Sequence, residues 1–163
     1  MEKSMKSNVV VYHSKYGATK EYATHIAKEL GCQALKISSK LKLDDYEQVI
    51  IGAPIYAGSA AGIKKLKLNS QEVYLFLVGL SHPVNNLDIF EGVVDKLDPS
   101  IKEKLNETLF LSGSMDLNKL NFIHRQIMKM VSKSQEGGDL SKPINNIDFD
   151  LTKAFIKKIK NSG

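Results

Sequence analysis

Near the N-terminus, residues 8–30 have the sequence NVVVYHSKYGATKEYATHIAKEL. The run from Val9 to Tyr12 is short, β-branched and aromatic, and turn-forming residues bound it, which predicts a buried strand. From Thr19 onward the apolar period changes to the i, i+3, i+4, i+7 spacing of a helix packed on a sheet. The residues of this stripe are Ala23, Ile26, Ala27 and Leu30. Gly31 follows at the usual place of a C-terminal cap, so the segment predicts a strand, a tight turn and an amphipathic helix.

The junction between this strand and this helix, Ser14 to Thr19, has residues suited to holding a phosphate. A helix N-terminus leaves N–H groups unpaired and carries a partial positive charge. Ser14 and Thr19 add hydroxyl groups, and Gly17 permits a positive φ or a close approach of the backbone to an anion. The pattern S-x-x-G-x-T is neither the dinucleotide fingerprint nor the P-loop. It indicates a phosphate site, with an ordinary strand-to-helix turn as the alternative.

The rest of the chain alternates between apolar strands and helical patterns. Further strands are expected over residues 33–37, 49–56, 73–79 and 108–112. Helices are expected over 63–68, over 88–106 with an interruption at Pro99, over 117–133 and over 150–160, with a loop over 134–146. In the last helix, the expected buried face contains Leu151, Ala154, Phe155 and Ile159. The alternation predicts a single doubly wound α/β domain over residues 1–163, a three-layer sandwich. Its five-stranded parallel sheet has the order 2-1-3-4-5, with helices on both faces.

Three strand ends are expected to meet at one edge of this sheet. In doubly wound sheets, ligands bind beyond the carboxyl ends of the strands, beside the first strand. The segments 14–19, 54–62 and 79–86 follow strands that are neighbours in the predicted order. The first segment suits a phosphate, and the other two, with Tyr56 and His82, suit a flat ring. No nucleophile with an adjacent base is apparent, so the catalytic residues stay unassigned.

The charge composition limits the kinds of partner that the protein is expected to bind. The chain has 23 lysines and arginines against 18 acidic residues, and this net charge of +5 favours an anionic membrane surface, an acidic substrate or an acidic protein. No nucleic-acid-binding module accompanies the charge, so nucleic acid is not expected. The start, MEKSMKSN, has no apolar core of a signal peptide, and no apolar run is long enough to span a bilayer. The lone Cys32 fits a reducing cytoplasm, and no residues have metal-ligand spacing.

The last third of the chain carries a more specific resemblance. Residues 110–116 are FLSGSMD, residues 125–129 are RQIMK, and Gly137-Gly138-Asp139 and Asp148-Phe149 follow. With the preceding segments, this series resembles flavodoxin-like FMN-binding domains, and in particular their menaquinone-dependent protoporphyrinogen dehydrogenase group. Phe149 departs from that group, which typically has Trp after the Asp. The resemblance implies FMN as the cofactor, and oxidation of protoporphyrinogen IX with transfer of electrons to membrane quinone.

The resemblance also implies which residues contact the cofactor. Those expected at the FMN phosphate are Ser14, Lys15, Tyr16, Gly17, Ala18 and Thr19. Those expected beside the isoalloxazine ring are Pro54, Ile55, Tyr56, Ala57, Gly58, Ser81, His82, Val84, Asn85 and Asn86. His13 is expected to have a structural role, and His25 to lie on the surface of the first helix.

The predicted helix over residues 117–133 has two contrasting faces. At about 100° per residue, the apolar face contains Leu120, Ile123, Ile127, Met130 and Val131 and is expected in the core. The opposite face contains Phe122, Arg125, Lys129 and Lys133. A phenylalanine among basic residues suits docking to an anionic membrane, an acidic partner or a propionate-bearing substrate. The alternative is that the following loop covers Phe122.

Three functions follow from these patterns. The first is an FMN-dependent oxidoreductase acting on a quinone or a porphyrinogen, in the cytoplasm and at the inner face of the membrane. The second is a soluble flavodoxin that carries electrons between proteins, although the basic charge is unusual for such a carrier. The third is a flavodoxin fold without FMN that serves as a binding module.

Overall fold

The computed structural model describes residues 7–14, 17–56, 58–69, 71–79, 87–115, 144–145 and 147–162. The predicted helix over 117–133 and the loop over 134–146 lie outside these residues, apart from Ile144 and Asn145. All structural statements below concern the described part of the chain.

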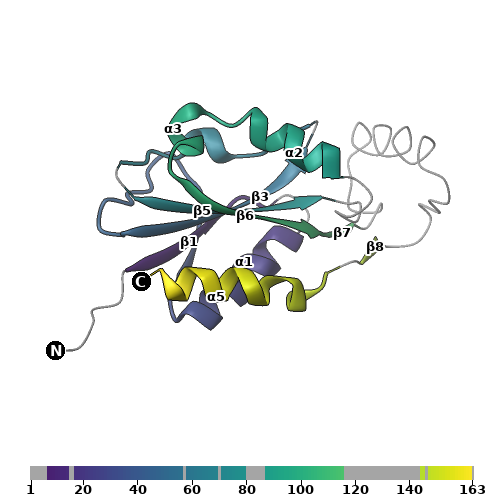
Figure 1. The fold of residues 1–163 in the computed structure, drawn as a ribbon, viewed down its shortest axis with the longest axis horizontal. Coiled ribbons are helices and arrows are strands. Elements are labelled where there is room, and N and C mark those ends of the chain that lie inside the picture. Colours follow the sequence, from purple (N-terminus) through teal and green to yellow (C-terminus); the bar gives the residue numbers. More distant parts are fainter. Residues whose placement is uncertain are drawn as a thin grey trace.

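The centre of the molecule is a parallel sheet (Figure 1). Its five main strands are β1 (Asn8–Tyr12), β2 (Gln33–Lys36), β3 (Gln48–Tyr56), β5 (Glu72–Gly79) and β6 (Leu105–Ser112). They lie in the order β2-β1-β3-β5-β6, which confirms the predicted order 2-1-3-4-5. The prediction did not include β4 (Ser59–Ala60), which pairs antiparallel with the end of β3, or the small separate ladder of β7 (Ser114–Met115) with β8 (Ile144–Asn145).

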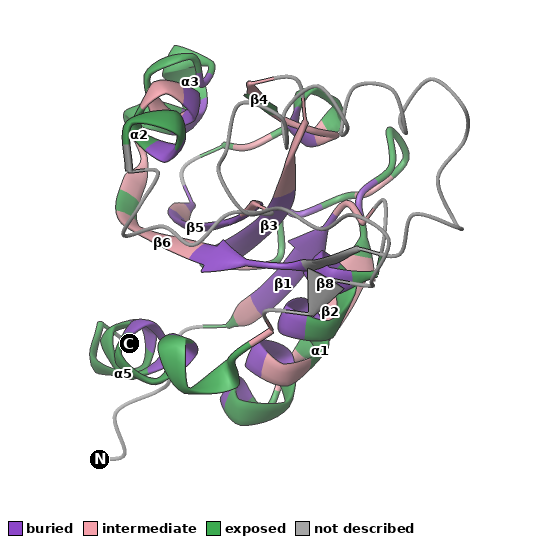
Figure 2. Ribbon diagram, turned by 90° about the vertical axis from the view of Figure 1, so that its right-hand side faces the viewer, coloured by how far each residue is buried: buried purple, intermediate pink, exposed green. Residues whose placement is uncertain are grey.

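Helices cover both faces of the sheet and complete the three layers (Figures 1 and 2). One face carries α1 (Ala18–Leu30) and α5 (Lys153–Asn161), and the other carries α2 (Leu87–Asp95) and α3 (Pro99–Lys102). The start of α3 has a local cause, because Asp98 accepts a hydrogen bond from the backbone N–H of Ser100 and Pro99 occupies the first turn.

The strands divide the core into two clusters because successive side chains point to opposite faces. On the α1/α5 face, Val10 and Tyr12 of β1 pack with Ile26 of α1 and Phe155 of α5. On the α2/α3 face, Val9 and Val11 pack in a cluster that includes Phe90 of α2. The unbroken apolar runs of the sequence are therefore strands buried on both sides, as parallel sheets require.

Two predicted helices differ from the structure. Over residues 63–68 only η1 (Ile63–Lys65), a single 3-10 turn, forms, and Leu66 is already extended with φ −77° and ψ 138°. The closing helix begins as a 3-10 turn, η4 (Phe149–Thr152), before α5. Because a 3-10 turn has a different angular period from an α-helix, the predicted stripe is wrong at its start. Leu151 and Ala154 are exposed, and the buried face of α5 consists of Phe155, Ile156 and Ile159.

Candidate functional site

The N-terminus of α1 is open for an anion. Gly17 precedes the helix in the left-handed region with φ +96°, and no side chain caps the first turn. The Gly17 N–H donates to Ser14 Oγ at 3.1 Å, which ties the start of the helix to the residue that follows His13. The next N–H groups, from Ala18 onward, lack intrahelical acceptors and carry the positive end of the helix dipole. The described start of α1 therefore has the N–H donors and the dipole that suit an anion.

Thr19 places a hydroxyl in this first turn. Its side chain is buried, with 1% exposure, directly beside the free N–H groups of the helix start. Gly113, after β6, closes the other side, where an added Cβ would lie 3.1 Å from Ala18 Cβ and 2.8 Å from Val78 Cγ1. No pattern in the sequence indicates that Gly113 approaches the start of α1.

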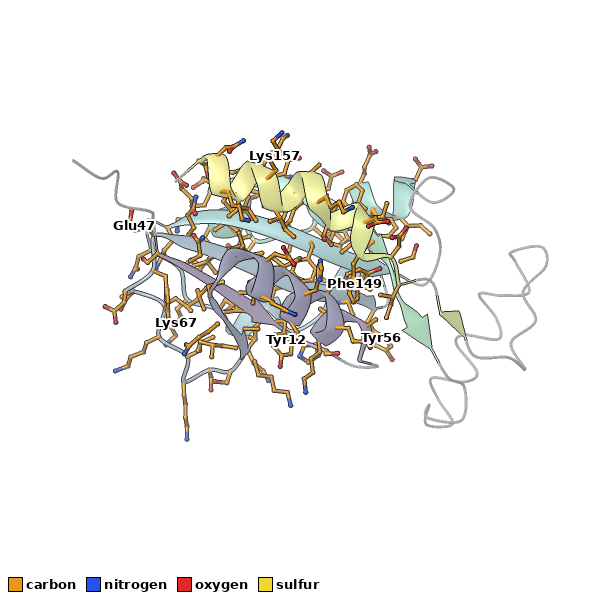
Figure 3. The ribbon with its side chains drawn as sticks, turned by 90° about the horizontal axis from the view of Figure 1, so that it is seen from below. Tyr12, Glu47, Tyr56, Lys67, Phe149 and Lys157 are labelled. Atoms are coloured by element: carbon orange, nitrogen blue, oxygen red, sulfur yellow. The ribbon has the colours of Figure 1, made fainter. Side chains whose placement is uncertain are left out.

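The end of β3 forms a hairpin that extends beyond β1. Tyr12, the last residue of β1, pairs with Gly52, whereas β3 continues to Tyr56, about 13 Å further at strand rise. The hairpin returns through Gly58 (φ +78°) into β4, with Tyr56 opposite Ser59. Tyr56 is half-buried at the carboxyl end of the sheet (Figure 3). Lys96 Nζ lies 3.4 Å from the Gly58 carbonyl oxygen and brings a positive charge to this hairpin.

His13 and Gly62 join the two loops. A Cβ placed on Gly62 would lie 2.4 Å from His13 Cγ and 2.8 Å from His13 Nδ1, so the imidazole occupies the space that a side chain would need. Gly62 also has φ +83°, where glycine is favoured. The His13 ring therefore packs on Gly62, and this contact connects the end of β1 to the hairpin after β3. The predicted convergence of these two segments is present.

The third predicted segment begins at the same edge. Pro54 of β3 pairs with Val78 of β5, and the Gly113 N–H donates to the Gly79 carbonyl at 2.7 Å. Several predicted site residues lie outside the described part of the chain. At the cofactor these are Lys15, Tyr16, Ala57, Ser81, His82, Val84, Asn85 and Asn86, and on the predicted docking helix Phe122, Arg125, Lys129 and Lys133. Those that the structure brings together are Ser14, Gly17, Ala18, Thr19, Pro54, Ile55, Tyr56 and Gly58.

Tyr22 connects the site edge to the segment before α5. Its buried hydroxyl donates to the Ser112 carbonyl at 2.6 Å and accepts from the Asp148 N–H at 3.0 Å. Burial raises the pKa of Tyr22. Phe149 meets Tyr22 edge to face and stacks on His25 with ring centroids 4.4 Å apart. The predicted surface position of His25 is therefore partly wrong, since its ring is half-buried under Phe149.

The described residues contain no cluster of three or more histidine, cysteine or acidic residues that could hold a metal ion. Nor does any helix among them have the length and apolar character needed to cross a membrane. Cys32 is half-buried against the α1/α5 core, and burial raises the pKa of its thiol.

Comparison with known families decides the classification. The family described as "Flavodoxin domain" matches residues 9–141. The chain belongs to this family. The match includes the open N-terminus of α1 and the hairpin after β3, and it supports FMN as the cofactor that the sequence implied.

Known structures share the fold at low sequence identity. A crystal structure from Bacteroides uniformis, of a protein provisionally named a flavoprotein, is 17% identical with a TM-score of 0.52, covering 80% of this chain and 99% of its own. A similarly named protein from Bacteroides eggerthii is 16% identical with a TM-score of 0.51, covering 77% and 97%. A flavoprotein from Lactobacillus acidophilus in complex with FMN is 17% identical with a TM-score of 0.45, covering 66% and 92%. No curated protein sequence matches the chain significantly.

Proposed function

We propose that this flavodoxin domain binds FMN at the carboxyl ends of β1 and β3 and functions as an FMN-dependent oxidoreductase. The observation that carries the proposal is the open N-terminus of α1, where no side chain caps the first turn and the buried Thr19 lies within it. The first N–H groups of the helix are donors without intrahelical acceptors, and a phosphate monoester supplies acceptor oxygens and negative charge.

The residues present fit the rest of the cofactor. Ser14 orients the turn, and the backbone N–H groups and hydroxyl of Thr19 would hold the phosphate. The hairpin after β3 offers backbone groups and the Tyr56 ring to the flavin, and Lys96 adds positive charge beside it. Bound FMN supplies the redox chemistry, while the protein supplies position and electrostatics.

The first test is a visible absorption spectrum of the purified protein, followed by an FMN titration if the protein is colourless. Thr19→Val keeps the volume of the side chain and removes its hydroxyl, so the Kd for FMN should rise about tenfold. Thr24→Val on the same helix is the matched control, because Thr24 is exposed and its hydroxyl donates to the Lys20 carbonyl within the helix. A protein that ignores micromolar FMN would overturn the proposal and favour the binding module without FMN.

The finer proposal concerns the substrate. The resemblance over residues 110–149 favours oxidation of a porphyrinogen, with a quinone as acceptor, at the inner face of the membrane, and the net charge of +5 suits an anionic surface. The docking residues proposed for it are Phe122, Arg125, Lys129 and Lys133. The variant Arg125→Glu/Lys129→Glu should lose binding to vesicles that contain phosphatidylserine. Retention of wild-type vesicle binding and turnover would contradict this docking surface.

The alternative is an electron carrier between proteins. It is favoured by segments 36–43 and 64–68, in which the lysines are exposed and the apolar side chains are not. Stopped-flow oxidation of the reduced protein separates the candidates. Fast oxidation by a menaquinone analogue in vesicles supports the membrane enzyme, whereas fast oxidation by a protein acceptor with slow quinone reaction supports the carrier.

A further inference from the structure

Two connections of the sheet contain the same four-residue sequence, Lys-Leu-Lys-Leu, at residues 40–43 and 65–68. In both, the lysines are exposed and the leucines are buried or half-buried in the core cluster on the α2/α3 face. An extended chain points successive side chains to opposite sides. The leucines therefore cover β1 and β3 where no described helix does, and the lysines are exposed.

The two connections lie side by side. At one end, Gln71 Nε2 donates to the Leu43 carbonyl at 2.8 Å, and Asn69 bonds to Asp44. At the other end, the Ile37 N–H donates to the Tyr12 carbonyl, while the neighbouring His13 packs on Gly62. Both connections therefore run from the carboxyl ends of the strands to their amino ends, along the same face.

Together they form a surface of one charge, which we call the lysine face. Its members are Lys36, Lys40, Lys42, Lys64, Lys65 and Lys67, all exposed. The sequence has no acidic residue over 33–43 or over 57–71. None of the six lysines forms an ion pair with a described residue, whereas Lys102, Lys153 and Lys158 do. The six lysines therefore have no ion-pair partner among the described residues, and the nearest acidic group gathers at one end of the face, where Asp44, Asp45, Glu47 and Glu72 line a cavity with Asn69 and Gln71.

The lysine face adjoins the proposed cofactor site. The end of the face nearest the cofactor site is at Gly62, which contacts His13, the residue before the predicted phosphate turn. The far end of the face is at Lys67, which lies at the opposite end of the molecule from Tyr56 (Figure 3). A partner bound along this face would have one end beside the hairpin after β3.

The chemistry of the face selects its partner. Charge alone attracts a protein to anionic lipid, but stable binding to a bilayer takes a second, apolar signal, and here the leucines point into the core. Recognition of single-stranded nucleic acid uses aromatic platforms and arginine, and the lysine face has neither. Hydrated lysine ammonium groups on flexible stems suit a transient, salt-sensitive contact, and electron-transfer complexes have such small interfaces. We infer that the lysine face docks the acidic surface of a protein redox partner, an inference that rests on the proposed FMN function.

The test compares two variants of equal charge. The first is Lys40→Gln/Lys42→Gln/Lys65→Gln/Lys67→Gln on the lysine face. The second is Lys153→Gln/Lys157→Gln/Lys158→Gln/Lys160→Gln on α5, which carries four exposed lysines on the other face of the sheet. The probe is cytochrome b5, an acidic haem protein, and circular dichroism verifies that both variants fold.

Binding is measured first by calorimetry at low ionic strength, on the FMN-loaded and the FMN-free protein. The Kd for cytochrome b5 should rise at least about tenfold in the lysine-face variant and less than about twofold in the α5 variant, and added salt should weaken wild-type binding. Stopped-flow spectra then follow electron transfer, in which FMNH2 and two ferric haems give FMN, two ferrous haems and two protons released to solvent. Its rate should fall in parallel with binding.

Each outcome has one meaning. Equal losses in the two variants would show a general effect of net charge and overturn the inference. Loss of binding to phosphatidylserine vesicles, with unchanged binding to cytochrome b5, would assign the face to lipid and also overturn it. A protein that binds FMN, but whose affinity for cytochrome b5 is the same in the wild type and in the lysine-face variant, would overturn this inference and leave the proposed function standing. Lysine-dependent binding by a protein that ignores FMN would support the surface and reject the proposed function.

Discussion

Gly62 is the position where one added methyl group should disturb the site most informatively. The Cβ of Gly62→Ala would lie 2.4 Å from Cγ, 2.6 Å from Cβ and 2.8 Å from Nδ1 of His13. Ordinary contacts of this kind are at 3.4 Å or more. The imidazole must therefore move, and with it the start of the phosphate turn.

The magnitude has two parts. Alanine at φ +83° incurs the left-handed penalty of about 1–2 kcal/mol, and forcing extra volume against His13 adds about 1–3 kcal/mol. Gly31→Ala is the matched control, because Gly31 has φ +69° and an added Cβ there meets nothing within 4 Å. It should show the first part alone. Gly62→Ala should thus lower the free energy of unfolding by about 2–5 kcal/mol, against about 1–2 kcal/mol for the control.

Urea unfolding with linear extrapolation measures these free energies. A double-mutant cycle with His13→Gly, which removes all three clashing atoms, should return a coupling energy of about 1–3 kcal/mol between positions 13 and 62. In parallel, the Kd for FMN should rise at least about tenfold in Gly62→Ala, equivalent to 1.4 kcal/mol, and change little in Gly31→Ala.

The reasoning is refuted if Gly62→Ala costs no more stability than Gly31→Ala, or if the cycle gives no coupling. Either result would mean that the His13 ring does not occupy the space above Gly62. If Gly62→Ala lowers the stability but leaves the FMN affinity unchanged, the contact between His13 and Gly62 exists but does not support the cofactor site.

Two further predictions concern buried titratable groups. Tyr22→Phe removes the hydroxyl that bridges Ser112 and Asp148 and should lower the free energy of unfolding by about 1–3 kcal/mol. Tyr46→Phe, whose hydroxyl bonds to no described residue, should change it by less than about 0.5 kcal/mol. Burial raises the pKa of Tyr22 in the folded state above the unfolded value of 10.0. The contribution of this hydroxyl to the free energy of unfolding should therefore be complete below that pH and be lost as the pH rises through the folded pKa. Urea unfolding at several pH values should find this loss in the wild type and not in Tyr22→Phe. Burial likewise raises the pKa of Cys32 above 9.0, so iodoacetamide at pH 8 should modify the folded protein at least about tenfold more slowly than the guanidinium-unfolded chain, and equal rates would contradict the burial.

The sequence predicted the parts of the fold that depend on neighbours along the chain. The first strand and the first helix formed within a residue or two of the expected bounds, including the glycine cap after Leu30. The strand order was also predicted, because alternating strands and helices leave few topologies. The predicted helix over 63–68 failed because its alternating leucines are half-buried in an extended chain, and the local pattern does not separate these states.

The sequence predicted the residues of the phosphate turn but not the distant residues that pack against it. Ser14, Gly17 and Thr19 could be identified because the phosphate turn is local in sequence. Two contacts join segments that are far apart in the chain, His13 with Gly62 and Gly113 with Ala18. The residue types at these positions do not predict either contact. Gly52 shows the same limit, since it lies within an apolar run and only the Phe76 ring beside it explains why a side chain is excluded.

By itself, the sequence determined the secondary-structure pattern, the likeness to flavodoxins and the basic charge of the chain. Only the tertiary structure decided which lysines share a surface and which glycines lie under another segment. The physical reason is that periodicity and turn chemistry act over a few residues, whereas packing and electrostatics act between whatever segments the sheet brings together. The two Lys-Leu-Lys-Leu segments are visible in the sequence, but they become one face only because the strands that they connect are neighbours in the sheet.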